Sequence, residues 1–321
     1  MGNGLLLHKK CMTATMIAAS PRVDWNVIQN MSKKQSAILF QNKIGSGAQG
    51  TVYGGTRKST GSPIVVKRVP LYHDNDDDIY SSEEMQNQIE HELFAQKKIV
   101  HPYIIKIHNG WKTNRHAYTL MDHIHGCDLF EYVYETYYDD DTKNKGKINN
   151  IIEENDIKIF TKKILEAIEY IHQKGIIHRD LKPENILLVN KNIQDPRIID
   201  FGLATLLTNK EELRRMVGSL HYVAPEIVNG EEYDEKVDIW SIGIIVYVML
   251  CGSFPFSVEA KDINDFAVKI SCFECDFDRI KSLVPWKNRS AESKSFVKFI
   301  LQNDKNQRPS AQLLLQHSWF K

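Results

Sequence analysis

β-branched residues gather in the first third of the chain in runs that predict strands. Residues 51–53 (Thr-Val-Tyr) and 64–69 (Ile-Val-Val-Lys-Arg-Val) form two such runs, and the turn-forming sequence Ser-Thr-Gly-Ser-Pro at 59–63 separates them. This arrangement predicts two strands joined by a turn, with a further strand before them. Residues 82–98 follow as an acidic segment that predicts a helix.

The most hydrophobic part of the chain lies between residues 237 and 252. It is too short for a membrane span, which needs about 20 apolar residues, and Asp238 and Gly243 interrupt it. The apolar stretches near the N-terminus are also short, and residues 8–10 (His-Lys-Lys) break them. The sequence therefore predicts neither a membrane helix nor a signal peptide.

Charge and cysteine content argue against two classes of partner. The 321 residues include 41 Lys+Arg and 41 Asp+Glu, so the formal net charge is zero and gives no electrostatic case for a nucleic-acid partner. Cys272 and Cys275 have the spacing of a metal or redox motif, but no second pair completes a zinc site. Scattered thiols fit a reducing, cytoplasmic location.

A glycine-rich segment precedes the predicted strands. Gly45, Gly47 and Gly50 stand between Ile44 and Val52. Because glycine lacks a Cβ atom, the backbone N–H groups of such a loop can approach phosphate oxygens closely. The same glycines also open dinucleotide-binding folds and occur in hairpin turns. A dinucleotide loop leads into a helix, whereas strands follow here, which favours a loop that covers phosphates from a sheet.

Lys67 lies within the apolar run at 64–69. A lysine in a strand is usually a solvated surface charge. The apolar residues around Lys67 and the glycines upstream favour a phosphate-binding role instead.

A dense group of polar residues occupies positions 178–185 (His-Arg-Asp-Leu-Lys-Pro-Glu-Asn), and Asp200-Phe-Gly follows. Asp180 can orient an acceptor hydroxyl, and Lys182 can neutralise charge on a transferred phosphate. Asn185 and Asp200 offer the hard oxygen ligands that magnesium prefers. This spacing indicates phosphoryl transfer from Mg-ATP.

These motifs, in this order from Ile44 to Arg308, resemble those of eukaryotic protein kinases. The resemblance implies an α+β, bilobal protein-kinase fold with a small β-rich N-lobe at about 38–123 and a larger, mainly helical C-lobe at about 124–321. It implies ATP and Mg²⁺ as cofactors, with ATP bound between the lobes. Residues 1–37 are then an N-terminal extension, which we expect to be flexible.

The resemblance also implies which residues surround the nucleotide. Lys67 would pair with the α- and β-phosphates, held by Glu92 on the predicted helix, with Glu90 as the alternative. Val65 stands where the family commonly has alanine and would form a tighter roof over adenine. The other implied contacts are Ile44, Gly45, Gly47, Gly50 and Val52 of the loop, Met121 behind adenine, Asp122 and Ile124 through their backbone, Leu187 beneath adenine, and Asp128 and Glu184 near the ribose.

Asp128 has two interpretations: it would bond ribose or a basic substrate side chain, or it would act as a carboxylate at a helix N-terminus. The sequence Lys182-Pro183-Glu184 is what serine/threonine kinases carry, so the resemblance implies serine and threonine residues of proteins as acceptors. Glu184 and Asp128 suggest an arginine upstream of the acceptor. Val248 stands where strongly arginine-directed relatives carry glutamate, which argues against a demand for two arginines.

The segment after Asp200 raises a question of charge balance. Arg179 carries a positive charge beside Asp180 that needs a negatively charged partner. Arg215 stands where many family members carry the activating phosphothreonine. We expect Glu211, Glu212 or a phosphorylated Thr208 to balance Arg179. Three structural contacts are also implied: Ser219 bridging Asp180 and Lys182, Asp238 bound to the backbone of the catalytic loop (residues 178–185), and Arg308 paired with Glu226.

Residues 251–256 and 317–319 resemble the calmodulin-kinase group, most closely the calcium-dependent protein kinases of plants and protists. These usually append calcium-binding helix–loop–helix pairs. The acidic runs at 74–78 and 139–141 lack the glycine and glutamate of such a loop. We expect those runs and a polar insert at about 137–150 to be surface loops. We expect a monomer that is a stand-alone kinase domain, or one cut from a longer protein.

The N-terminus supports a second hypothesis on location. Gly2 permits myristoylation, and Lys9, Lys10 and Cys11 would give the second signal that membrane association needs. Leu6 stands where serine or threonine is usual, so a plain leader is favoured.

The alternative function is a catalytically silent pseudokinase scaffold. Pseudokinases typically lose the phosphate-binding lysine, the catalytic aspartate or the magnesium aspartate. Lys67, Asp180, Asn185 and Asp200 are all present, which favours an enzyme.

Overall fold

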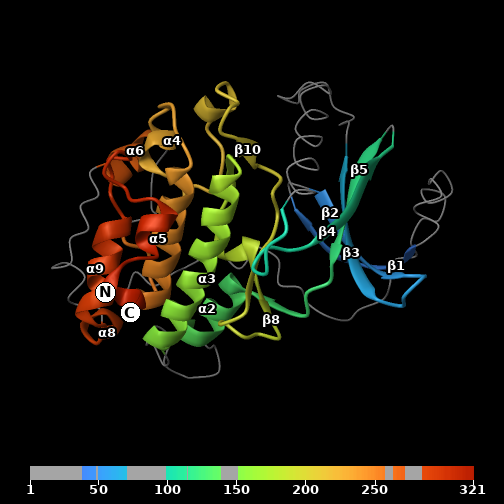
Figure 1. Ribbon diagram of the computed structural model, residues 1–321, viewed down its shortest axis with the longest axis horizontal. Coiled ribbons are helices and arrows are strands. Elements are labelled where there is room, and N and C mark those ends of the chain that lie inside the picture. The colour runs from blue at the N-terminus through green and yellow to red at the C-terminus, as the bar shows by residue number, and fades with distance from the viewer. Residues whose placement is uncertain are drawn as a thin grey trace. The chain divides into compact units, whose positions relative to one another are not determined.

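The computed structural model describes residues 38–47, 50–70, 99–113, 115–138, 151–256, 263–271 and 284–321. The described residues form two compact units (Figure 1). One, the sheet unit, contains the described residues up to Val100 together with Ile105–His123. The other, the helical unit, contains His101–Ile104 and Ile124–Lys321. The chain thus passes from one unit to the other between His123 and Ile124; the lobe bounds expected above stay a prediction.

Several predicted features lie outside the described residues. They are Gly2 with its basic neighbours, the acidic runs at 74–78 and 139–141, the helix at 82–98 with Glu90 and Glu92, and the pair Cys272 and Cys275.

Five antiparallel strands build the sheet unit, in the spatial order β1-β2-β3-β5-β4. They are β1 (Ile38–Gly47), β2 (Gly50–Arg57), β3 (Pro63–Pro70), β4 (Ile107–Lys112) and β5 (His116–Asp122). The strands predicted at 51–53 and 64–69 are confirmed as parts of β2 and β3. Gly50 is required where β2 begins: its φ is +121°, and a Cβ there would lie 2.4 Å from the carbonyl oxygen of Arg68.

The two faces of this sheet differ in character because side chains alternate along each strand. Ile38, Ile64, Val66, Tyr118 and Leu120 form one buried hydrophobic cluster, which we call the core face. Lys67 occupies the intervening position on β3 and therefore projects from the opposite side, which we call the lysine face.

The helical unit contains the remaining elements of the described chain. They are β6 (Gly126–Asp128), α2 (Leu129–Tyr138), α3 (Glu154–Gln173), β7 (Ile176–Ile177), η3 (Pro183–Asn185), β8 (Ile186–Val189), β9 (Pro196–Ile198), β10 (Thr205–Leu206), η4 (Glu212–Arg214), α4 (Pro225–Val228), α5 (Lys236–Cys251), α6 (Ile263–Ser271), α8 (Val284–Lys287), α9 (Ala291–Ile300), α10 (Ala311–Leu314) and η5 (Ser318–Phe320).

Helix α5 forms the centre of the helical unit and packs beside α3 and α9 (Figure 1). Every residue from Val237 to Cys251 is buried, as expected for a helix that is apolar on all sides. Gly243 lets α9 approach, because a Cβ there would lie 2.6 Å from a methyl carbon of Leu301. Gly252 ends the helix in the left-handed conformation, with φ of 71°. In the described part of the chain, no helix is long and apolar enough to cross a membrane.

The polar insert begins later than we expected. Tyr137 and Tyr138 are the last residues of α2, and the Tyr137 side chain is fully buried. Its hydroxyl donates to the carbonyl oxygen of Met249 at 2.7 Å, so an aromatic residue at the edge of a polar segment belongs to the core. The prediction of a surface loop from residue 137 is wrong for these two positions.

Candidate functional site

The lysine face gathers the predicted nucleotide-binding residues of the sheet unit. In the strand register Val52 pairs with Lys67, and Val65 pairs with Met121. Residues directly opposite in antiparallel strands share a face, so these four side chains lie side by side. Lys67 is 8% exposed, and the surface-charge interpretation of this lysine is therefore wrong.

The glycine-rich strand adds to the same face. Gly45 pairs with Val52, and Gly47 pairs with Gly50 across the β1–β2 turn. Ile44 lies over Gly54, because a Cβ on Gly54 would lie 3.5 Å from the Ile44 Cδ1 atom. About half of the Ile44 side chain remains exposed. The face thus presents an apolar surface beside one ammonium group.

Asp122 ends β5 with its polar groups already engaged inside the sheet unit. Its backbone N–H donates to the carbonyl oxygen of Lys106 at 3.1 Å, and its carboxylate lies 2.5 Å from His108 Nε2. The N–H of Asp122 is therefore occupied, which narrows the backbone contacts that it could offer to adenine. Ile124 is the first residue of the helical unit after the crossing.

In the helical unit, Asp128 and Leu187 are brought together by strand pairing between β6 and β8. Gly126 makes this pairing close: its φ is +156°, and a Cβ would lie 1.8 Å from the carbonyl oxygen of Leu188. The Asp128 carboxylate accepts a hydrogen bond from the backbone N–H of Glu131 at 2.7 Å, at the start of α2. The helix-terminus interpretation of Asp128 is thereby confirmed.

Burial raises the pKa of Asp128. The hydrogen bonds from the backbone of the first turn of α2 act in the opposite direction, but burial is the larger effect. Desolvation by neighbouring protein atoms also raises the pKa of Glu184, although the residue keeps an exposed surface; the charges of Asp128 and Asp180 act in the same direction. The negative charge of Asp128 is thus one of the causes that raise the pKa of Glu184.

The catalytic loop is anchored to α5 through one buried carboxylate. Asp238 is fully buried and accepts hydrogen bonds from the backbone N–H groups of His178 at 2.9 Å and Arg179 at 2.8 Å. Its other contact is His172 Nε2 at 2.8 Å. Burial alone would raise the pKa of Asp238, but the bonds from His172 and His178 outweigh it and lower the pKa. The expected tie between Asp238 and the loop is confirmed.

Among the described residues, three side chains surround the Asp180 carboxylate, which is nearly buried at 4% exposure. Ser219 Oγ donates to Asp180 Oδ1 at 2.8 Å and accepts from Lys182 Nζ at 2.7 Å. Lys182 Nζ is also 3.0 Å from Asp180 Oδ2. Asn185 Nδ2 donates to the same oxygen at 3.0 Å and to the Asp180 carbonyl at 2.7 Å. The predicted Ser219 bridge is confirmed, and the carboxylate is fixed in one orientation.

The two predicted magnesium ligands lie on neighbouring backbone segments. Because β8 and β9 pair in register, the N–H of Ile199 donates to the carbonyl oxygen of Asn185 at 2.9 Å. Asp200 follows Ile199 directly and adopts the left-handed conformation, with φ of 59°. Its carboxylate accepts from the N–H of Gly202 at 3.1 Å.

This arrangement fits a magnesium ion. The Asn185 amide nitrogen is used within the loop, so its amide oxygen is the atom that can act as a ligand, and Asp200 supplies a carboxylate. Both are the hard oxygen donors that Mg²⁺ takes.

Arg179 has its anion inside the chain, and the structure decides among the three expected partners in favour of Glu212. Arg179 Nη2 is 3.0 Å from Glu212 Oε2, and Arg215 Nη1 is 2.7 Å from Glu212 Oε1. Burial would raise the pKa of Glu212, but the bonds from Arg215 and Arg179 outweigh it and lower the pKa. Gly218 is needed for this packing, since a Cβ there would lie 2.7 Å from the Arg179 carbonyl oxygen.

Tyr233 is the member of this cluster that the sequence analysis missed. Its hydroxyl oxygen lies 2.9 Å from the carbonyl oxygen of Glu212 and 3.0 Å from that of Arg215, which share its one proton as acceptors, and it accepts from Arg179 Nη1 at 3.1 Å. Tyr233 is 2% exposed, although charged residues surround it in the sequence. A single aromatic residue within a charged stretch was the available signal.

The ion pair expected between Glu226 and Arg308 is confirmed. Arg308 Nη1 and Nη2 donate to the two carboxylate oxygens of Glu226 at 2.7 and 3.0 Å. The side chains are 0% and 3% exposed, so the pair is buried and bidentate.

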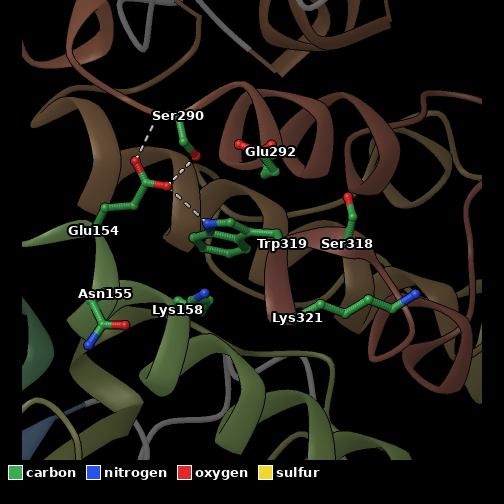
Figure 2. A pocket seen from close by; sticks show the side chains of 8 residues that line it. All are labelled: Glu154, Asn155, Lys158, Ser290, Glu292, Ser318, Trp319 and Lys321. Carbon is green, nitrogen blue, oxygen red and sulfur yellow. Dashed lines mark hydrogen bonds between the residues drawn. The ribbon is translucent and has the colours of Figure 1, made fainter.

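A separate hollow of about 430 Å³ lies where α3, α9 and the last residues meet (Figure 2). Its wall is held by Glu154, whose carboxylate accepts from Ser290 N at 2.9 Å and Trp319 Nε1 at 3.1 Å. No predicted site residue lines this hollow. The Glu154 bonds connect α3 to the segment at Ser290 and to the last residues of the chain. The hollow is distinct from the group of residues around Asp180.

Comparison with known proteins gives one family. The sequence model described as protein kinase domain matches residues 39–320. A probable myosin light chain kinase of Dictyostelium discoideum is 32% identical over 291 residues, which are 90% of this chain and 68% of that protein.

Two further relatives are longer than the matched region. Myosin light chain kinase 3 of Homo sapiens is 32% identical over 279 residues, 86% of this chain and 30% of that protein. Calcium-dependent protein kinase 5 of Plasmodium berghei (strain Anka) is 32% identical over 291 residues, 88% of this chain and 45% of that protein. The chain thus spans less than half the length of these two relatives.

Proposed function

The chain belongs to the protein kinase family and is a serine/threonine protein kinase, and we propose that it is catalytically active with Asp180 at its centre. The reaction transfers the γ-phosphate of Mg-ATP to a serine or threonine hydroxyl of a protein substrate. The observation that carries this proposal is the fixed, nearly buried Asp180 carboxylate between Lys182, Asn185 and Ser219.

Each residue of this group has a role that follows from its chemistry. Asp180 accepts a hydrogen bond from a hydroxyl group, as it does from Ser219, and so can orient the acceptor hydroxyl. Lys182 carries positive charge beside Asp180 and offsets charge on the transferred phosphate. Because the transition state is loose, the rate enhancement comes mainly from positioning and charge stabilisation.

Asn185 and Asp200 are the residues that would hold magnesium. A bound Mg²⁺ ion neutralises phosphate charge during transfer. In the sheet unit, Lys67 would hold the α- and β-phosphates, and Val52, Val65 and Met121 would contact adenine from the lysine face. The shared face of these residues supports that assignment.

The carboxyl pair Asp128 and Glu184 supports a preference for one arginine upstream of the acceptor. An apolar pocket lies beside the catalytic loop, and none of the described residues that line it is a carboxylate. This lining supports a preference that does not need a second arginine. The lining residues are Phe130, Val133, Tyr134, Tyr138, Pro183, Tyr222, Val248 and Gly252. Pro183 belongs to the segment after Asp180, and Tyr222 follows Ser219 closely, so this pocket adjoins the acceptor position.

Activity would not require a phosphate on the activation segment, the stretch from Asp200 to Glu226, because Glu212 already pairs with Arg179. Calcium dependence and myosin light chains as substrates are suggested by the names of the relatives. The human myosin light chain kinase and the Plasmodium calcium-dependent kinase are equally similar to this chain, at 32% identity. Their names therefore favour neither calcium dependence nor myosin light chains over the other.

Incubation of the purified protein with Mg-ATP and a serine peptide containing one upstream arginine tests the proposal. We expect phosphate transfer that the Asp180→Asn variant lacks. A folded protein that binds ATP but transfers no phosphate, before or after treatment with an upstream kinase, would support the pseudokinase scaffold. Replacing the peptide arginine by alanine tests the substrate preference, and an unchanged KM would refute it.

A further inference from the structure

The turn that joins β2 to β3 exposes three hydroxyl side chains. Residues 58–63 (Lys-Ser-Thr-Gly-Ser-Pro) are all exposed, and Ser59, Thr60 and Ser62 carry the hydroxyl groups. Gly61 has a φ of +69°, and a Cβ atom there would meet no atom of the described residues within 4 Å. The described part of the chain therefore leaves this turn open to another molecule.

Short-range hydrogen bonds hold the turn in its closed form. The backbone N–H of Gly61 donates to the carbonyl oxygen of Arg57 at 2.8 Å, and the N–H of Thr60 donates to the same oxygen at 3.3 Å. The Thr60 hydroxyl donates to Ser62 Oγ at 2.9 Å and accepts from the Ser62 N–H at 3.3 Å. Because an exposed turn with such local bonds opens at little cost in free energy, its hydroxyl groups can be presented in an extended segment.

An arginine with exposed surface stands directly before these hydroxyl groups. Arg57, the last residue of β2, is half-buried and lies two positions before Ser59 and three before Thr60. The site proposed below rests on the proposed function, which gives the active site a preference for one arginine upstream of the acceptor. The turn thus carries an acceptor sequence of the kind that the enzyme itself would select.

Two other described hydroxyl residues have an arginine at most three positions before them, but those arginines are buried. Ser290 follows Arg289, which is 7% exposed, and Ser310 lies two positions after Arg308, which is 1% exposed. Both guanidinium groups are held by buried hydrogen bonds, so their presentation to an active site would leave buried groups unsatisfied. Among the described residues, Arg57 is therefore the arginine that can reach an active site together with a nearby hydroxyl group.

We propose that Ser59 and Thr60 form an autophosphorylation site, which is modified by the active site of this same enzyme. The hydroxyl oxygen of either residue forms a bond to the γ-phosphorus of Mg-ATP, while the bond from that phosphorus to the β–γ bridging oxygen breaks and ADP leaves. The hydroxyl proton passes to the Asp180 carboxylate and from there to water. The new phosphate carries a charge of about −1.5 to −2, which Arg57 and Lys58 beside it offset.

The test incubates the phosphatase-treated full chain with Mg-ATP and locates the phosphate by mass spectrometry. We expect phosphate on Ser59 or Thr60, and none there in the Asp180→Asn variant. Arg57→Ala should lower the initial rate of phosphorylation at this turn about tenfold, because a charge-assisted contact with the active site is lost. The matched control is Lys58→Ala, which removes the neighbouring positive charge and should leave the rate unchanged.

Phosphorylation of a serine peptide, measured on the same preparations, separates this site from the proposed function. We expect wild type and Arg57→Ala to have the same kcat/KM for the peptide, which shows that the variant is folded. Transfer to the peptide without phosphate on the turn, an equal rate at the turn in Arg57→Ala and wild type, or phosphate that persists there in Asp180→Asn would overturn the site alone. Transfer to neither acceptor would refute the proposed function, and the site with it.

Discussion

Replacing Glu212 by glutamine removes the anion that balances Arg179 and keeps the shape of the side chain. The Arg179 side chain is 2% exposed and that of Glu212 is 25% exposed, so this is a largely buried interaction. Glu212 also pairs with Arg215, whose side chain is 37% exposed. The substitution therefore weakens the contact between the activation segment and Arg179 of the catalytic loop, and a second contact, to Arg215, within the activation segment itself.

The size of the effect follows from these exposures. A buried hydrogen bond to a charged group contributes about 1.5–3 kcal/mol, and an exposed ion pair about 0.2–1 kcal/mol. Arg179 keeps its bonds to the carbonyl oxygens of Leu203 and Glu212 and to the Tyr233 hydroxyl. The loss thus stays below the roughly 3–5 kcal/mol of an isolated buried charge. We estimate about 2 kcal/mol, or about a thirtyfold shift toward a disordered segment.

The assay is kcat/KM for a serine peptide, measured on protein treated with phosphatase. We expect wild type to stay active without phosphate and Glu212→Gln to lose about ten- to thirtyfold. Glu211→Gln is the matched control, because Glu211 is exposed and lies one position away; it should behave as wild type. Full activity of Glu212→Gln, or loss of wild-type activity after phosphatase treatment, would refute the reasoning.

Two further predictions concern stability and pH. Arg308→Ala leaves the buried Glu226 carboxylate without its ion-pair partner and should lower the free energy of unfolding by about 3–5 kcal/mol, which is measured as a lower Tm. The control is Arg214→Ala, which should leave Tm nearly unchanged because the Arg214 side chain is 69% exposed. Equal Tm values for both variants would contradict the estimate. The pKa values of Asp128 and Glu184 are raised, so both groups lose charge at a higher pH than ordinary carboxyl groups. The KM advantage of an arginine peptide over its alanine counterpart should therefore shrink as pH falls from neutral; a constant ratio down to pH about 4 would contradict this.

Local sequence was sufficient where one short segment carries the chemistry. The β-branched run around Lys67 forms a strand because such residues suit a pleated surface, and its period of two places Lys67 and the core residues on opposite faces. The spacing of Asp180, Lys182 and Asn185 within one loop likewise indicates, before any fold is known, which residues would meet the acceptor hydroxyl, the transferred phosphate and the magnesium ion. The charge of Asp238 in an apolar helix already required a partner.

What the sequence alone determined, then, is the family, the strands of the sheet unit and the residue types of the site. Only the tertiary structure decided which carboxylate meets Arg179, since Glu211 and Glu212 are neighbours with the same chemistry. It also assigned Tyr137 to the core, and Tyr233 to the cluster around Arg179. Each of these depends on contacts between segments far apart in the chain, as the 112 positions between Tyr137 and Met249 show. Such contacts are set by how helices and loops pack in three dimensions, and the local periodicity of the sequence does not carry that information.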